Sequence, residues 1–303
     1  MSRVIVFLLV ILSGVAAVSA TFHPPIDAHA EDVAAWRAGR LQRLTAPNGW
    51  LSLVGLEWLK AGANRVGSAA DNDIVLTVGP AHLGVVTLEA DGRTRIAFAA
   101  DAQATVDGRQ VADAELVDDV HATDTPTTVA FGSASFYVID REGRKGLRVK
   151  DPAAPTRTGF AGIDAFPVDV GWRIVADWQP AAAGETLEMG TAIGTTETYP
   201  VPGHLHFSRD GHDFELLPVV EESGDAQYFI VFADRTSGKE TYGAARFLYV
   251  DPPDADGKVV IDFNKAYNPP CAFTRYATCP LAPPENRLDL RVTAGEKTYA
   301  GRH

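Results

Sequence analysis

Apolar residues recur along this chain with two different periods. Between residues 27 and 44 they return every three or four positions, and charged residues occupy the opposite side of the helical wheel. This period predicts one amphipathic helix, with Asp27 as the residue that caps its start. The residues near its buried face are Val33, Trp36, Arg40, Leu41 and Leu44.

From Trp50 onward the apolar residues fall in short runs of strand length, separated by turns such as Ala90-Asp91-Gly92-Arg93. Strands spaced about ten residues apart are typical of a sandwich or barrel. No long helices alternate with the runs, as a doubly wound α/β fold requires. The fold class is therefore mainly β. The expected strands are 73–76, 84–88, 95–98, 127–131, 135–139, 171–178, 186–193, 204–207, 214–220, 228–232, 245–250, 259–263 and 288–292.

A proline-rich segment, Asp151-Pro152-Ala153-Ala154-Pro155, is the best candidate for a linker between two β regions. We expect a signal peptide in residues 1–20, a helix in 21–46, a β-sandwich in 47–150 and a second antiparallel β domain in 151–303. A chain of 303 residues agrees with this division, since domains average about 150 residues.

The first twenty residues have the features of a signal peptide. Arg3 precedes an apolar run from Val4 to Leu12, and Val18-Ser19-Ala20 fits the small-x-small cleavage rule. We expect cleavage after Ala20 and an exported protein, periplasmic or secreted; an uncleaved anchor helix is the alternative. The run is short for a membrane span, so no span is expected after cleavage.

The charge balance narrows the range of partners. Lys and Arg number 27 against 39 Asp and Glu, a formal net charge of −12. Nucleic acids and anionic membranes are bound through clustered Lys and Arg, so neither is an expected partner. The segment Thr236-Ser237-Gly238-Lys239 lacks the rest of a phosphate loop, and no Gly-x-Ser-x-Gly elbow occurs. No cofactor is therefore expected.

Two cysteines lie close together near the end of the chain, in NPPCAFTRYATCP. In an exported protein, Cys271 and Cys279 are expected to form a structural disulfide. A redox site usually has Cys-x-x-Cys spacing, and a zinc site needs more ligands than two cysteines.

One region of the first half carries a set of family-like motifs. Gly67 precedes Asp71-Asn72-Asp73-Ile74-Val75-Leu76, and the segments 105–111, 128–132 and 136–138 follow as a turn and closing strands. With these motifs, residues 64–139 resemble a forkhead-associated (FHA) β-sandwich. That family binds phosphothreonine.

The positions that bind phosphate in that family differ here. Ser68 stands in place of the family's Arg, Gly79 in place of its Ser, and Gln103-Ala104 in place of its Asn-Gly. Without the guanidinium and the hydroxyl, a phosphate loses its charge-assisted hydrogen bonds. The resemblance therefore implies a scaffold rather than a phosphopeptide reader.

A second set of motifs extends over the mature chain and is densest in its second half. They are Gly49-Trp50-Leu51, 232–238, Thr241-Tyr242-Gly243, 246–248, 262–271, Cys279-Pro280, Glu285-Asn286-Arg287-Leu288 and 294–297. With them the chain resembles a bacterial family known as domain of unknown function 1684. The resemblance implies no activity.

Polar residues of these motifs are the candidate ligand-binding site. Asp262 with Asn264, and Tyr242 with Arg246, have spacings that place each pair on one strand face. One interpretation is a pocket in which Arg246 or Arg287 binds a carboxylate while an acidic group acts as acid, base or anchor. The other is a buried network that crosslinks turns around the disulfide loop. The candidates are Asp234, Thr236, Tyr242, Arg246, Asp262, Asn264, Tyr267, Asn268, Asn286, Arg287 and Glu296.

The remaining chemistry-bearing residues have simpler explanations. His204-x-His206 has the spacing of two metal ligands on a strand, but no third ligand is placed, so no metal site is expected. Asp254-Ala255-Asp256-Gly257 lacks the closing Glu of a calcium loop and predicts a turn. The five tryptophans are expected to fill cores.

Three functions stay open at this point. The first is a binding module for a small molecule or an envelope component. The second is a cofactor-free hydrolase that uses the Asp, Arg and Tyr residues of the second half. The third is a structural or assembly protein of the envelope.

Overall fold

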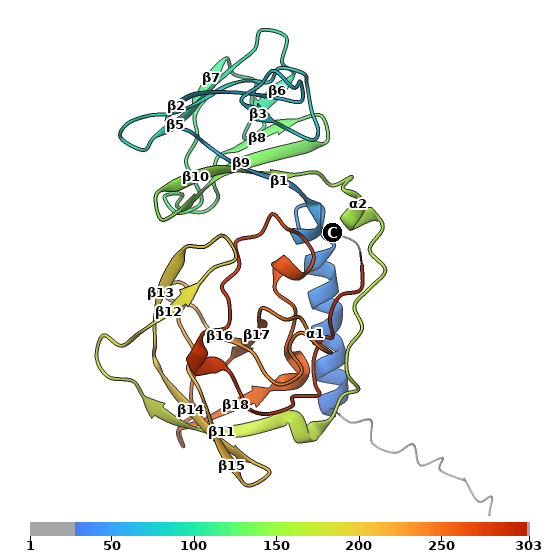
Figure 1. The fold of residues 1–303 in the computed structure, drawn as a ribbon, viewed down its shortest axis with the longest axis vertical. Helices are drawn as coiled ribbons and strands as arrows, with labels where there is room; N and C mark the ends of the chain where they lie inside the picture. The colour runs from blue at the N-terminus through green and yellow to red at the C-terminus, as the bar shows by residue number, and fades with distance from the viewer. Residues whose placement is uncertain (1–27, 302–303) are drawn as a thin grey trace, which may run out of the picture.

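The structure is a computed structural model that describes residues 28–301. The expected signal peptide, its cleavage site and the capping residue Asp27 lie outside the described residues. As expected, the fold is mainly β, and two lobes lie end to end along the long axis of the molecule (Figure 1). None of the helices in the described part of the chain has the length and apolar character needed to span a bilayer.

The first helix, α1 (Ala28–Leu44), runs along the second lobe rather than the first (Figure 1). Its buried residues Val33, Arg40 and Leu44 belong to the face that the sequence period predicts. In the first turns of the helix, Asp32 pairs with Lys265. In its middle, Arg37 donates a hydrogen bond to the carbonyl of Phe166. The helix is therefore fixed to the second lobe at residues 166 and 265, which lie before and after the strands of its main sheet in sequence.

The first lobe is a sandwich of two five-stranded sheets. Neighbouring strands are antiparallel except β2 and β3, which are parallel. One sheet has the order β1 (Leu53–Trp58), β10 (Arg144–Lys150), β9 (Ala134–Arg141), β8 (Thr128–Phe131) and β6 (Ala104–Val106). The other has the order β3 (Ile74–Val75), β2 (Gly62–Gly67), β4 (Gly84–Leu88), β5 (Thr94–Phe98) and β7 (Asp113–Glu115).

Alternating side chains of both sheets meet in the core of the sandwich. In β5, Thr94 and Ile96 are buried while Arg95 and Ala97 are exposed, the two-residue period of a strand with one face in water. Ile96 packs in one cluster with Phe131, Phe136 and other apolar residues from both sheets. This shared core holds the two sheets together.

Three sheets build the second lobe. The largest has the order β15 (His212–Leu216), β14 (Gly203–Arg209), β11 (Arg173–Pro180) and β18 (Lys258–Asp262). The two others are hairpins, β12 (Thr186–Gly190) with β13 (Thr196–Pro200), and β16 (Tyr228–Phe232) with β17 (Arg246–Val250). The short helices of the chain are α2 (Pro155–Thr158), η1 (Trp50–Ser52), η2 (Val170–Trp172), η3 (Phe263–Lys265), η4 (Pro270–Ala272) and η5 (Pro284–Asn286).

The hairpin β16–β17 is apolar on both faces. Ile230, Phe232, Leu248 and Val250 enter the large core of the second lobe. Phe229, Val231 and Phe247 belong to a separate cluster on the other face, with Trp50 and Tyr267 packed against it. The hairpin therefore lies between these two clusters, with one of them packed on each of its faces.

The expected strand at 288–292 is wrong. Leu288, Leu290 and Val292 alternate inward as in a strand, but no ladder forms. The amide of Leu288 and the carbonyl of Leu290 bond irregularly to the backbone of residues 233 and 235. At Val292 side chains take over: its amide donates to Asp234, and its carbonyl accepts from Arg246. The hydrophobic period thus predicted burial correctly, but the backbone bonds do not form a regular ladder.

The lobes meet through hydrogen bonds as well as apolar contacts. Arg141 and Arg148, on β9 and β10, donate to the hydroxyl of Thr278 at 3.2 and 3.1 Å. The hydroxyl of Thr156, which follows the expected linker, donates to the carbonyl of Leu51 at 2.6 Å. The segment after residue 151 is therefore packed against the helix η1.

Gly79 offers a test of the packing of the sandwich. It has a φ of +104°, and a Cβ there would lie 2.6 Å from the ring of Phe131. Gly92 has a φ of +85° and nothing within 4 Å of the same position. We expect Gly92→Ala to cost about 1–2 kcal/mol of unfolding free energy from the backbone. Gly79→Ala should cost about 1–3 kcal/mol more because it overpacks the core. Urea unfolding measures both, and equal losses would contradict the steric argument.

Candidate functional site

The eleven residues that the sequence singles out do not gather around one cavity. Most of them lie in separate hydrogen-bonded groups inside the second lobe, and among them only Tyr267 lines the cleft between the lobes that is described below. These groups fix turns and termini. Whether any of these residues binds a ligand stays a prediction.

The first group surrounds Arg246, at the start of β17. Its side chain is 1% exposed and donates to the carbonyls of Val292 and Ala294 and to the carboxylate of Asp234. Asp234 also accepts from the hydroxyl of Thr236 at 2.7 Å. Burial lowers the pKa of Arg246, and the neighbouring Asp234 opposes that effect. A group so enclosed crosslinks the chain rather than meeting solvent.

The second group lies where β18 ends. Asp262 accepts from the amide and side chain of Asn264 at 3.1 and 2.9 Å, and its other oxygen lies 2.8 Å from His29 of α1. Asn264 in turn exchanges hydrogen bonds with the backbone of Asp169. The predicted shared strand face is wrong for this pair because Asn264 belongs to η3, not to the strand. It is also wrong for Tyr242, which precedes β17 and donates to the carbonyl of Cys271.

The third group joins α1 to the chain's last segment. Glu296 accepts the amide of Asn268 at 2.7 Å and pairs with Arg40 at 3.4 Å. Arg40 also donates to the carbonyl of Asn268 at 2.9 Å. Burial raises the pKa of Glu296, while Arg40 and the Asn268 amide favour its ionised form.

Two further candidates act through backbone groups. Asn286 is fully buried and bonds the amide and carbonyl of Leu217 together with the carbonyl of Val231. Arg287 is exposed and donates to the carbonyl of Ala282 at 3.2 and 3.3 Å.

The two cysteines are free thiols in this structure and face each other. The amide of Cys271 donates to the sulfur of Cys279 at 3.2 Å, and the reciprocal bond measures 3.4 Å. The hydrogen bond from Cys279 lowers the pKa of Cys271, whereas burial raises that of Cys279. The expected disulfide is not formed here and stays a prediction.

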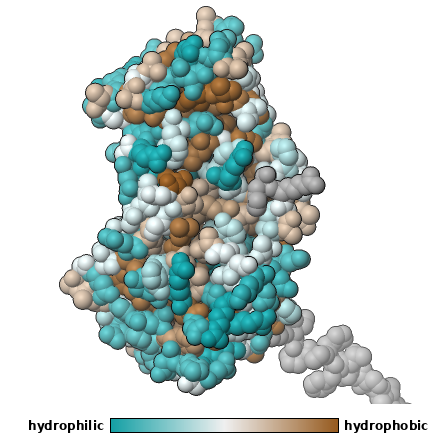
Figure 2. Space-filling view, in the orientation of Figure 1, coloured by the Kyte–Doolittle hydropathy of each residue, from teal (hydrophilic) through white to brown (hydrophobic). Residues whose placement is uncertain are grey.

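A cleft of about 940 Å³ lies where the two lobes and α1 meet. Figure 2 shows hydrophilic atoms over most of the lower lobe and apolar atoms between the lobes. Segments far apart in the sequence line the cleft: the second half of α1 with the turn 46–50 that follows it, Lys150 at the end of β10, the hairpin β16–β17 with Glu221 and Gln227 before it, and residues 265–270.

Aromatic side chains form the floor of this cleft. Tyr249 and Tyr267 stack at 6.4 Å between ring centroids and 14° between planes. Trp36 lies 6.0 Å from Tyr267, and Phe247 meets Tyr267 edge-on at 5.8 Å. Tyr249 is 40% exposed. Such rings give a planar apolar ligand a large contact area at a small cost in side-chain entropy.

Charged groups surround this floor unequally. Four cations line the cleft, Arg40, Arg43, Lys150 and Lys265, against the single carboxylate of Glu221. Glu221 accepts a hydrogen bond from the hydroxyl of Tyr249.

Ionisation of the floor residues is shifted toward the neutral forms. Desolvation by the cleft walls raises the pKa of Glu221 even though part of its side chain reaches solvent, and the same cause raises the pKa of Tyr249 and Tyr267. Both phenols therefore stay neutral in the physiological range, so the positive charge of the cleft is not offset by phenolate.

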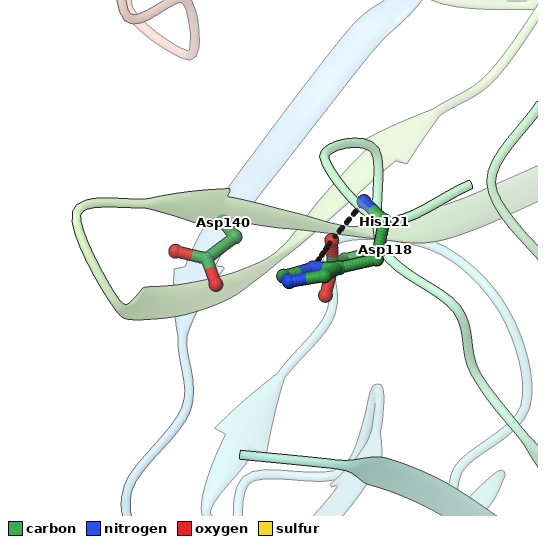
Figure 3. A group of neighbouring side chains, drawn as sticks. All are labelled: Asp118, His121 and Asp140. Atoms are coloured by element: carbon green, nitrogen blue, oxygen red, sulfur yellow. Dashed lines mark hydrogen bonds and ion pairs between the residues drawn. The ribbon is translucent and has the colours of Figure 1, made fainter. Parts of the chain in front are cut away.

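A smaller acidic group lies in the first lobe. Oxygens of Asp118 and Asp140 and a ring nitrogen of His121 lie within 4.8 Å of one another (Figure 3). The ammonium of Lys145, however, is 2.5 Å from Asp118 and 3.8 Å from Asp140. Burial would raise the pKa of Asp118, but the hydrogen bonds from Lys145 and His121 lower it to about 2. The lysine already supplies the positive charge that an ion would bring.

His204 of β14 is likewise occupied by neighbouring carboxylates. His204 and His206 stack at 6.2 Å, and His204 hydrogen-bonds Glu185 at 2.7 Å and also Glu215. Burial by itself lowers the pKa of His204, but the hydrogen bonds to Glu215 and Glu185 outweigh it and raise the pKa. The two carboxylates hold the imidazole as a crosslink between β14, β15 and Glu185, the residue before β12.

Comparison with known proteins finds a family match in the second half of the chain. Residues 158–297 match the model of a protein family of unknown function, DUF1684. Through this segment the chain belongs to the DUF1684 family. An uncharacterised protein of Haloarcula marismortui, solved in solution by NMR, is 32% identical over 47% of this chain and 79% of its own, with a TM-score of 0.40. No curated protein matches.

Sequence reasoning missed most of the cleft. Trp36 and Trp50 were expected to fill cores, yet both line it, and Arg43, Lys150 and Tyr249 belonged to no motif. One signal was present: β16 and β17 are apolar at successive positions, which predicts a strand that needs cover on both faces. The segment that covers the second face could not be read from local pattern.

The pH dependence of stability tests the histidine crosslink. Since the folded-state pKa of His204 is raised above 6.5, its stabilisation is complete below about pH 6.5 and is lost as the pH rises through the raised value. We expect wild type to lose stability relative to His204→Gln over that range. Urea unfolding from pH 6 upward measures the difference. Glu185→Gln with Glu215→Gln should abolish the same slope; a slope that survives in His204→Gln would contradict this assignment.

Proposed function

We propose that this protein is an exported binding protein that holds a small molecule with a planar, apolar body in the cleft between its lobes. One observation carries the proposal: a cleft of about 940 Å³ whose floor is a continuous group of aromatic side chains. Sites for small ligands commonly measure about 300–1,000 Å³ and combine apolar walls with a few polar groups. The hydrolase alternative draws no support from its own residues, because Asp234 and Arg246 satisfy each other in the interior.

The first lobe is proposed to be an FHA-like scaffold. Two five-stranded sheets that share one core support that arrangement. The hydroxyl of Ser68, at the position of the family's phosphate-binding Arg, donates to the carbonyl of Gly79 at 3.0 Å. This contact engages the Ser68 hydroxyl within the protein and gives no support to phosphopeptide binding.

The neutral dye N-phenyl-1-naphthylamine, whose emission rises in apolar surroundings, tests the cleft. We expect it to bind, and Tyr249→Ser to weaken binding about two- to twelvefold, since an aromatic contact contributes about 0.5–1.5 kcal/mol. Val260→Ser is the matched control, because Val260 is 38% exposed on a strand away from the cleft. Equal weakening by both variants, or no binding to wild type, would refute the proposal.

Export and disulfide formation are proposed together. The reciprocal amide–sulfur hydrogen bonds of Cys271 and Cys279 support the pairing. We expect protein recovered from the periplasm to begin at Thr21 and to gain two hydrogen masses on reduction. Cys271→Ser with Cys279→Ser should lower the unfolding free energy by about 2–3 kcal/mol, as for a small loop. Mass spectrometry and urea unfolding measure these, with cytoplasmic protein as the reduced control. Free thiols in the exported protein would contradict the pairing.

A further inference from the structure

The cations around the cleft differ in how they are neutralised. Arg40 pairs with Glu296, and Lys265 pairs with Asp32 at 2.7 Å. Arg43 and Lys150 form no ion pair with any carboxylate among residues 28–301; Lys150 donates to the carbonyl of Asn48 at 2.8 Å. Two of the four cations therefore carry charge that the described chain does not balance.

The turn 46–50 contacts the segments that carry both cations, the end of α1 and the end of β10. Lys150 reaches Asn48, and the next residue, Gly49, packs so closely on α1 that a Cβ there would lie 2.6 Å from the carbonyl oxygen of Arg43. Arg43 and Lys150 line the cleft together with Asn48 and Gly49. The turn thus brings the end of the helix and the end of β10 to one edge of the aromatic floor.

A buried cation adds to the positive potential at this edge. Arg148 is 3% exposed, lies over the ring of Trp50, and has only hydroxyl partners among the described residues. Its Nε is buried without a hydrogen-bond partner. Burial and the charge of Arg148 together lower the pKa of Lys150. Since the whole chain has a net charge of −12, such a cluster is an exception that an anion would stabilise.

We propose that the ligand of this cleft is an aromatic organic anion, such as an aryl carboxylate or sulfonate, whose ring lies on Tyr249 at the open edge of the aromatic floor and whose charged group meets Arg43 and Lys150. The inference rests on the proposed function and adds the charge of the ligand to it. The aromatic floor provides contact area, and the two cations discriminate between acids and neutral molecules of the same shape.

Each cation also has a structural explanation. Arg43 complements the negative end of α1, and Lys150 secures the turn through Asn48. These explanations do not account for the position of the two side chains, which line the same aromatic cleft and have no carboxylate partner within the described part of the chain. A measurement that separates charge recognition from folding decides between them.

Two dyes of nearly equal shape provide that measurement. The anion 8-anilino-1-naphthalenesulfonate differs from neutral N-phenyl-1-naphthylamine by one sulfonate group. We expect the anion to bind wild type about tenfold or more tightly, as for a charge-assisted hydrogen bond. Arg43→Gln with Lys150→Gln should lower the affinity for the anion much more than the affinity for the neutral dye, and so remove most of this preference. Fluorescence titration at low and high salt measures both affinities.

Two further variants keep the test decisive. Arg275→Gln removes a surface charge whose side-chain partner is Tyr276 rather than a carboxylate, and it should leave the preference intact. Arg43→Lys with Lys150→Arg keeps both charges and should retain the preference if the fold is intact. Equal affinity of wild type for both dyes, or an equal loss in Arg275→Gln, would overturn the anion while leaving the cleft as a binding site. If Tyr249→Ser bound both dyes as tightly as wild type, the proposed function itself would be overturned.

Discussion

The hairpin β16–β17 imposes the main constraint on this fold, because neither of its faces is polar. One face completes the large core over the four-stranded sheet. The other face must also be covered, and burying its phenylalanines contributes about 1.5–3 kcal/mol each. Phe229 and Phe247 are 3% and 5% exposed, so most of that face is indeed buried. Tyr249 at its edge remains open, and the cleft begins there.

Residues of β12 and of segment 277–282 cover most of this second face, and α1 covers its edge at Tyr267. Helix α1 brings Trp36 against Tyr267, and Arg40 passes over the same ring at 4.7 Å to reach Glu296. A buried ion pair is costly to desolvate, and removing one partner leaves an uncompensated charge. The main effect of the Arg40–Glu296 pair is therefore to orient α1 rather than to stabilise the fold. By fixing the rotation of the helix, the pair also fixes where Arg43 lies.

Much of the architecture could be predicted from local pattern, but the site could not. The helix 28–44 and strands such as Gly84–Leu88 and Tyr228–Phe232 follow from period and turn chemistry. The period failed at 288–292, where Asp234 and Arg246 bind backbone groups that a ladder would have used. Polar residues two apart also misled, since Asp262 and Asn264 meet through a turn instead of a strand face. Long-range contacts decide these cases, and local sequence does not encode them.

The division of labour within the cleft follows from the same geometry. Its floor, with Phe229, Phe247, Tyr249 and Tyr267, lies within the segment 158–297 that matches the family model. Arg43 and Lys150 precede that segment and belong to the helix and the first lobe. The polar groups that the family motifs contain, such as Asp234 with Arg246, support the floor from below. Most of the aromatic floor thus comes from one part of the chain, and the two cations without a carboxylate partner among the described residues come from another. In the proposed site, a change in ligand charge would therefore require substitutions only at Arg43 and Lys150, outside the apolar clusters.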